Sequence, residues 1–211
     1  MKTDDLINLM AQDAPVRMRL GRMMGLALLA GVAVSVAILV LTIGLRHNMS
    51  TVVETARVLF KVCVTLVLAI TACRLVFQIG RPGVPVRTLA LTLLVPAAMV
   101  VLAVAVELLV LPQQQWATSL IGGHPFFCMA FIPVLALAPL TGFLLALRAG
   151  APGNPGLAGA AAGLAAGGIA AAVYAWHCPD DSPLFLATWY TIAIAVVTAI
   201  GFVAGRRLLR W

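Results

Sequence analysis

The chain has 211 residues, of which 63% are hydrophobic and only 10% are charged. A soluble globular protein carries about 45–50% apolar and about 25% charged residues. The composition therefore excludes a soluble globular chain and predicts an integral membrane protein. In such a protein the useful unit of length is a span of about 20 apolar residues.

Six stretches of the sequence are apolar and long enough to cross a bilayer as helices. They cover residues 24–45, 58–79, 89–111, 127–147, 157–176 and 185–204. A helix satisfies its own backbone hydrogen bonds in hydrocarbon, whereas the alternating pattern of a β-barrel is absent from the sequence. We therefore predict an all-α polytopic membrane protein. Its six-helix transmembrane domain covers residues 24–211 and follows a tail over residues 1–23.

The positive charges predict the orientation of these spans, because Lys and Arg accumulate in cytoplasmic loops. With the N-terminus inside, only Arg46, Arg57 and Lys61 lie on the outer side. The inner side then holds Lys2, Arg17, Arg19, Arg22, Arg74, Arg81, Arg87, Arg148, Arg206, Arg207 and Arg210. Both termini are therefore predicted to be cytoplasmic. The net charge of +7 reports this orientation and an attraction to anionic membrane lipid, and direct nucleic-acid binding is not needed to explain it.

The tail is predicted to form one short amphipathic helix. Thr3 is a suitable N-cap, Asp4 and Asp5 suit the first turn, and Pro15 ends the helix. One apolar stripe is formed by Leu6, Ile7, Leu9 and Met10. A helix of about twelve residues is marginal alone in water, so it should order against a surface. That surface is either the membrane or the groove of a cytosolic protein.

The four cysteines fall into two pairs. Cys63 and Cys73 share the second predicted span and lie about 15 Å apart along it, too far to bond with each other. Cys128 begins the fourth span and Cys178 lies in the third outer loop. Both are therefore expected at the outer surface, in a compartment that permits disulfides.

Histidines and acidic residues accompany the outer cysteines, namely His124, His177, Asp180 and Asp181. Two Cys and two His from separate loops suit a disulfide or a thiophilic metal such as zinc or cadmium, although only His124 and Cys128 have helical ligand spacing. Three interpretations stay open at this point. They are a functional thiol pair, a site for a transient metal ion, and a static disulfide that ties the fourth and fifth spans together.

Charges inside the spans are functional candidates by default. Lys61, Arg74 and Glu107 are the charges found there, and each lies near an end of its span, from which it can snorkel to the interface. No charge lies near the midplane, which disfavours an ion or proton relay. No catalytic motif accompanies them, so the chain is not expected to be an enzyme.

Two further patterns concern packing. Gly159, Gly163 and Gly167 recur at four-residue spacing, which predicts that another helix approaches the fifth span closely. Aromatic residues near the outer ends of the spans are typical of an interfacial belt, and they are Trp116, Trp176, Trp189 and Tyr190.

Three segments together give the chain a resemblance to a known family. They are the opening Thr3-Asp4-Asp5-Leu6-Ile7, the Phe126-Phe127-Cys128 segment, and the run His177-Cys178-Pro179-Asp180-Asp181-Ser182-Pro183-Leu184-Phe185 followed by Trp189-Tyr190. With six spans between and around them, the chain resembles the NrsF-type membrane anti-sigma factors over its whole length.

The resemblance implies a multi-pass protein of the bacterial inner membrane that holds an extracytoplasmic-function (ECF) sigma factor inactive. It also implies release of that sigma factor under heavy-metal or oxidative stress, with Cys128 and Cys178 as the responding thiols. The sigma factor would bind the tail through Asp4, Asp5, Leu6, Ile7, Leu9 and Met10. The alternative is a small transporter or membrane scaffold with a structural disulfide.

Overall fold

The structure is a computed structural model that describes residues 5, 20–46, 55–81 and 86–209. The described residues are helical and contain no strand. Within these described ranges, six segments are long and apolar enough to cross a membrane, which confirms the predicted all-α fold with six spans. They are Leu20–Thr42, Ala56–Ile79, Val86–Val110, Gln113–Leu147, Pro155–Tyr174 and Pro183–Leu208.

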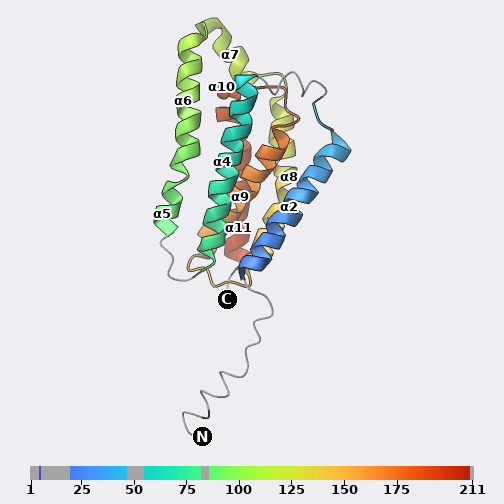
Figure 1. Ribbon diagram of the computed structural model, residues 1–211, viewed down its shortest axis with the longest axis vertical. Coiled ribbons are helices and arrows are strands. Elements are labelled where there is room, and N and C mark those ends of the chain that lie inside the picture. The colour runs from blue at the N-terminus through green and yellow to red at the C-terminus, as the bar shows by residue number, and fades with distance from the viewer. Residues whose placement is uncertain (1–4, 6–19, 47–54, 82–85, 210–211) are drawn as a thin grey trace.

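The helices that make up these segments are labelled in Figure 1. They are α2 (Leu20–Thr42), α4 (Ala56–Ile79), α5 (Val86–Leu91), α6 (Leu94–Val110), α7 (Gln113–Ile121), α8 (Pro125–Leu147), α9 (Pro155–Tyr174), α10 (Pro183–Phe185), the π-helix η1 (Leu186–Tyr190) and α11 (Thr191–Leu208). Proline occupies the first position of α8, α9 and α10, where its missing N–H costs no helical hydrogen bond.

Three segments differ from the uninterrupted spans and open loops that the sequence predicts. The third span is broken between α5 and α6, where Pro96 cannot donate a hydrogen bond to the carbonyl of Thr92. The second outer connection, expected as a loop, contains α7. The sixth span begins with a π-helical turn over 186–190. The first helix also begins four residues earlier than predicted, at Leu20, and ends at Thr42.

Helix α9 lies at the centre of the bundle, with α4, α8 and α11 around it (Figure 1). Its close contact with α11 depends on glycine, because a Cβ on Gly159 would lie 2.2 Å from the carbonyl oxygen of Gly201. A Cβ on Gly163 would lie 2.6 Å from the carbonyl oxygen of Val197. The glycine spacing in the fifth span is thus confirmed as a helix-packing motif.

Helix α2 packs on α8 through a similar small-residue contact. A Cβ on Gly31 would lie 2.7 Å from the Cα of Pro139, so only glycine fits there. One turn along, the buried Ser35 hydroxyl donates to the carbonyl oxygen of Leu135, at 2.7 Å. Pro139 thus lies at the contact between the two helices rather than on a lipid face.

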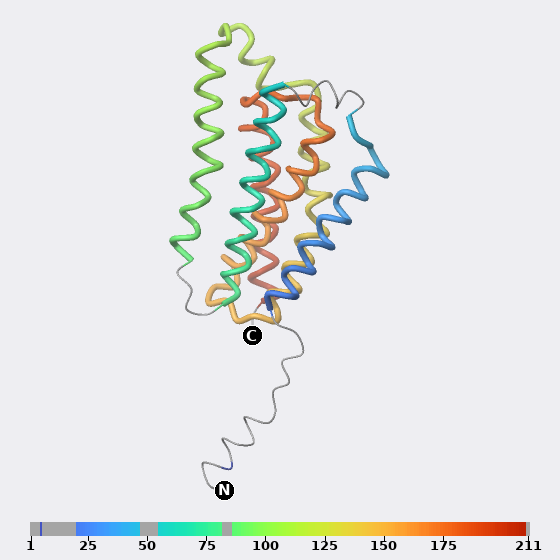
Figure 2. Tube along the Cα trace, viewed as in Figure 1, coloured from blue at the N-terminus to red at the C-terminus, as the bar shows by residue number. Residues whose placement is uncertain are grey.

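Helix α6 stands at the edge of the bundle, as the tube in Figure 2 shows. Only 6% of an 18-residue apolar stretch within Val86–Val110 is buried inside the protein. The corresponding share for Pro155–Tyr174 is 78%. Large apolar side chains such as Leu102, Leu109 and Val110 point outward from α6. An apolar surface of this kind is suited to contact with hydrocarbon.

The two ends of the bundle are formed by different elements. We call the end formed by α7, α10 and the loop 175–182 the crown, which is uppermost in Figure 1. We call the opposite end, where Leu20, Gly80 and Gly150 meet, the base. At the base a Cβ on Gly80 would lie 3.1 Å from Leu20 Cδ2, and one on Gly150 would lie 3.0 Å from the Gly80 carbonyl oxygen.

Candidate functional site

Cys128 and Cys178 meet inside the crown. Cys128 lies in the first turn of α8, and Cys178 lies in the loop that follows α9. Their sulfur atoms are 3.8 Å apart, and both side chains are almost completely buried. No disulfide joins them in this structure. Two thiols this close can be joined by a disulfide after a small movement, because an S–S bond is about 2.0 Å long.

Lys61 of α4 anchors the loop that carries Cys178. Its ammonium donates to the carbonyl oxygen of Cys178 at 2.8 Å and to that of Asp180 at 3.2 Å, and it contacts Asp181 Oδ1 at 2.5 Å. The side chain is only 2% exposed. The expectation that Lys61 snorkels to the interface is therefore wrong, because the loop supplies three oxygen partners inside the protein.

The two aspartates of the loop bind protein groups on either side of it. Asp181 also forms an ion pair with Arg46, with 2.9 Å between Nη1 and Oδ2. Asp180 accepts hydrogen bonds from the backbone N–H groups of Gly123, at 3.0 Å, and His124, at 3.2 Å. The loop is thus held to α4, to the end of α2 and to the connection between α7 and α8.

Glu107 of α6 makes a second anchor. It is 5% exposed, and its carboxylate accepts from the Ser182 hydroxyl and from the Leu184 backbone N–H, each at 2.9 Å. Arg57 lies 3.7 Å from its other oxygen. The expectation that Glu107 reaches an interface is also wrong. The start of α10 offers it two donors, which compensate its burial.

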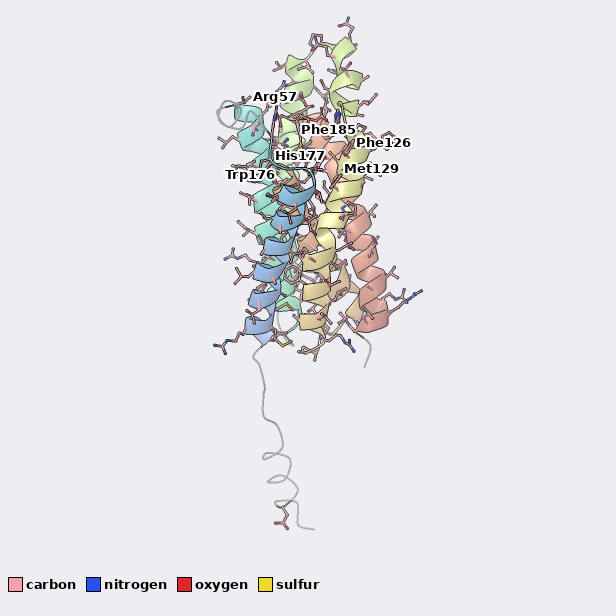
Figure 3. All side chains as sticks on the ribbon, turned by 90° about the vertical axis from the view of Figure 1, so that its right-hand side faces the viewer. Arg57, Phe126, Met129, Trp176, His177 and Phe185 are labelled. Carbon is pink, nitrogen blue, oxygen red and sulfur yellow. The ribbon has the colours of Figure 1, made fainter. Side chains whose placement is uncertain are left out.

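The histidines beside the thiols have contacts of their own. His177 Nδ1 bonds the carbonyl oxygen of Gly44 at 3.0 Å, and the ring of His124 packs on Phe127 with 5.7 Å between centroids. Figure 3 labels His177 and Trp176, which lie in the loop 175–182 of the crown. Across the described residues, no group of three or more His, Cys, Asp and Glu side chains is placed to hold a metal ion.

Two buried tyrosines complete the thiol site. The rings of Tyr174, at the end of α9, and Tyr190, at the end of η1, lie 6.1 Å apart. Tyr190 is only 2% exposed, so it does not belong to the interfacial belt in which its sequence position placed it. Its buried hydroxyl has no hydrogen-bond partner among the described residues, and it contributes to lowering the pKa of Cys178.

The pKa of Cys178 is lowered to about 7 from its ordinary value of 9.0. The largest cause is the hydrogen bond from Cys128, and the positive charge of Lys61 contributes as well. Burial opposes both effects without cancelling them. Because the thiolate is the nucleophilic form, Cys178 is prepared to react near neutral pH.

Comparison with known proteins places the chain in a family. Residues 9–211 match the family described as "Negative regulator of sigma F". The chain belongs to this family. It is 35% identical to "Anti-sigma-F factor NrsF" of Caulobacter vibrioides and 28% identical to "Probable anti-sigma-F factor NrsF" of Azospira oryzae, with full coverage of both chains in each case. No solved structure matches the chain.

Membership of this family of regulators agrees with the expectation that the protein is not an enzyme. The family match begins within the tail, at residue 9. Of the tail residues expected to bind a sigma factor, Asp5 is described and is exposed. The others lie outside the described residues, namely Asp4, Leu6, Ile7, Leu9 and Met10.

Sequence reasoning missed several residues of this site. Lys61 and Glu107 carry a signal that was available, since charges inside spans are functional candidates. Tyr174 and Tyr190 carry no such signal, because only the fold places them beside the thiols. The π-helical turn that ends at Tyr190 is a local irregularity of a kind often found at functional sites.

Proposed function

We propose that this protein is an inner-membrane anti-sigma factor that binds an ECF sigma factor through its tail. A change in the state of Cys128 and Cys178, caused by oxidative or heavy-metal stress, releases that sigma factor. Membership of the anti-sigma family supports the general role. The observation that carries the sensing role is the buried pair of free thiols, 3.8 Å apart.

The tail suits a protein groove better than lipid. Its apolar stripe would fill the groove, while Asp4 and Asp5 in the first turn would face basic side chains of the partner and would be repelled by anionic lipid. A sigma factor covered in this way cannot present the same groove to RNA polymerase. The partner is thus held by one helical segment joined to the base of the bundle.

The energy required is within the reach of thiol chemistry. Moving an equilibrium from 1:99 to 99:1 takes about 5.5 kcal/mol. Closing or opening a disulfide contributes about 2–5 kcal/mol to the state that it favours. Only the upper end of this range approaches that requirement, so a disulfide at the crown shifts most of the population when it contributes about 5 kcal/mol.

Affinity purification from membranes tests the proposal. Full-length protein is expected to retain a sigma factor, identified by mass spectrometry, and protein lacking residues 2–14 is expected to lose it. The double variant Leu6→Asp, Leu9→Asp should behave like the deletion. A matched control, Asn8→Ser with Gln12→Ser, changes polar positions of the same segment and should retain the partner.

The thiols are tested in the same assay. Cys128→Ser and Cys178→Ser should each abolish the stress-dependent change in sigma-factor binding, whereas Cys63→Ser, whose side chain is exposed on α4, should leave it intact. Retention of the response in both single variants, with normal expression, contradicts the sensing role. Failure of any sigma factor to depend on the tail contradicts the anti-sigma role itself and leaves the transporter alternative.

A further inference from the structure

We propose that the thiol pair reduces a hydroperoxide that reaches it from the bilayer, with Cys178 attacking the O–O bond and Cys128 closing a disulfide. The hydroxyl of Tyr190 passes a proton to the leaving oxygen. The proposal assigns an oxidant class and separate roles to the two cysteines. Only its consequence for signalling rests on the proposed function, because the reaction itself needs no sigma factor.

An apolar cavity lies beside this site, with Tyr190 in its lining and neither cysteine among the residues that line it. It has a volume of about 410 Å³ and lies between α4, α6 and the start of the sixth span. Its lining includes Thr65, Leu68, Ala97, Val100, Leu186 and Tyr190. Cavities of this size hold small organic molecules. Because its walls belong to membrane-spanning segments and α6 stands at the edge of the bundle, the cavity is accessible from hydrocarbon.

Tyr190 links the cavity to the thiols. Its side chain lines the cavity, and its hydroxyl is buried without a hydrogen-bond partner in the described part of the chain. A buried hydroxyl without a partner is unfavourable, so such a group indicates an atom that binds there transiently. The same hydroxyl interacts with Cys178, which puts it beside the sulfur that would attack.

The surroundings of the pair distinguish its two members. Lys61 bonds the carbonyl oxygen of Cys178, and its positive charge acts on that thiol. The groups that face Cys178 are Cys128 from α8, Tyr174 from α9, Lys61 from α4, Tyr190 from η1 and Asp180 from its own loop. Lys61 is the cation of this set, and it favours the thiolate of Cys178, so we assign the attack to Cys178.

The chemistry balances in two steps. The Cys178 thiolate attacks the terminal oxygen of R–O–O–H, an S–O bond forms, and the O–O bond breaks with its electron pair leaving on RO. The proton that Cys178 released reaches RO through the Tyr190 hydroxyl and gives ROH. The Cys128 thiol then attacks the Cys178 sulfenic acid, which forms the S–S bond and releases water. Two thiols lose two electrons, and the peroxide gains them.

The test uses the full-length reduced protein in liposomes, with disulfide formation between Cys128 and Cys178 followed by mass spectrometry. Cumene hydroperoxide supplies the apolar oxidant, and hydrogen peroxide supplies the aqueous one. Cumene hydroperoxide is expected to react faster. Ala97→Trp, which fills the cavity, should remove this preference, whereas Ala98→Trp, on the same helix but outside the cavity lining, should keep it.

Two further variants separate the roles of the residues. With dimedone as the trap, Cys128→Ser is expected to accumulate the adduct at Cys178, and Cys178→Ser is expected to accumulate none at Cys128. Tyr190→Phe should slow oxidation by cumene hydroperoxide roughly tenfold, because the variant loses one hydrogen bond to the leaving oxygen. It should not slow alkylation by iodoacetamide, whose iodide leaving group needs no proton.

Specific results would overturn the proposal. Equal rates with the two peroxides, unaffected by Ala97→Trp, would show an aqueous route. A dimedone adduct on Cys128 in the Cys178→Ser variant would reverse the roles of the thiols. An equal loss of both reactions in Tyr190→Phe would make Tyr190 merely structural. Normal oxidation without any sigma factor released would instead contradict the proposed function and leave this reaction in place.

Discussion

Lys61 shows what a sequence can and cannot reveal about a single residue. Its position within a span marks it as a functional candidate, but its partners are oxygen atoms of Cys178, Asp180 and Asp181, more than a hundred residues away. The cysteine pair was accessible to prediction because both members lie at ends of spans that the sequence places on the same side of the membrane. The contacts of Lys61 could not be predicted from the sequence, because they depend on how one loop turns back over α4.

Replacing Lys61 with Met tests its effect on the neighbouring thiol. Met has a similar length but no charge, so the thiolate of Cys178 loses a favourable interaction and the pKa of Cys178 rises from about 7 toward 9.0. The pH dependence of iodoacetamide labelling at Cys178 measures this directly. In the native protein the labelling rate should reach half its maximum near pH 7, and in Lys61→Met the midpoint should move upward.

Arg57→Met provides the matched control for this experiment. Arg57 lies one turn before Lys61 on α4, but its ion pair is with Glu107, at 3.7 Å, and its side chain is 53% exposed. Its removal should leave the labelling midpoint near 7. A midpoint that stays in place in Lys61→Met, or moves equally in both variants, would show that the charge of Lys61 does not act on Cys178.

At the scale of elements, the sequence predicts where a membrane-spanning segment exists better than it predicts whether the helix in that segment is continuous. Hydrophobic length identifies all six spans, because the bilayer imposes it. Pro96 lies inside the third span, yet whether a proline ends, kinks or merely bends a helix depends on its neighbours. The π-helical turn at 186–190 has no periodic signal, since it is one irregular turn within an otherwise apolar helix.

The contact between α9 and α11 supports an element-scale prediction about stability. Gly159→Ala places a Cβ 2.2 Å from the Gly201 carbonyl oxygen, and backbone on both helices must move apart. We expect a loss of about 1–3 kcal/mol in the free energy of unfolding, the usual cost of overpacking. Thermal unfolding in detergent, followed by circular dichroism, measures the effect.

Gly25→Ala serves as the control for this substitution. Gly25 also lies within a helix, α2, but a Cβ there meets nothing within 4 Å. Alanine should therefore be neutral, or stabilising by up to about 1 kcal/mol, because it restricts the unfolded chain. Equal behaviour of the two variants would show that the close approach of α9 and α11 does not limit stability.

At the scale of the molecule, α4 connects the two ends at which the proposed events occur. Lys61 holds the thiol loop at the crown, and Gly80, directly after α4, packs on Leu20 at the base. Helical rise places these two residues about 28 Å apart along the axis. Leu20 begins the first span and directly follows the segment that contains the tail, so a displacement of α4 at the crown has a rigid route to that segment.

This connection predicts reciprocal coupling between thiol state and partner binding. If forming the Cys128–Cys178 disulfide changes the affinity for the sigma factor by some factor, binding of the sigma factor must change the disulfide equilibrium by the same factor. A tenfold change in affinity corresponds to a shift of about 30 mV in the reduction potential of the pair. Titration in glutathione buffers, with and without saturating sigma factor, measures that shift.

The change in sigma-factor affinity and the shift in reduction potential must agree in size, whichever redox state releases the partner. An altered affinity at an unchanged potential would show that the crown and the tail respond to oxidant separately, through two unrelated sites.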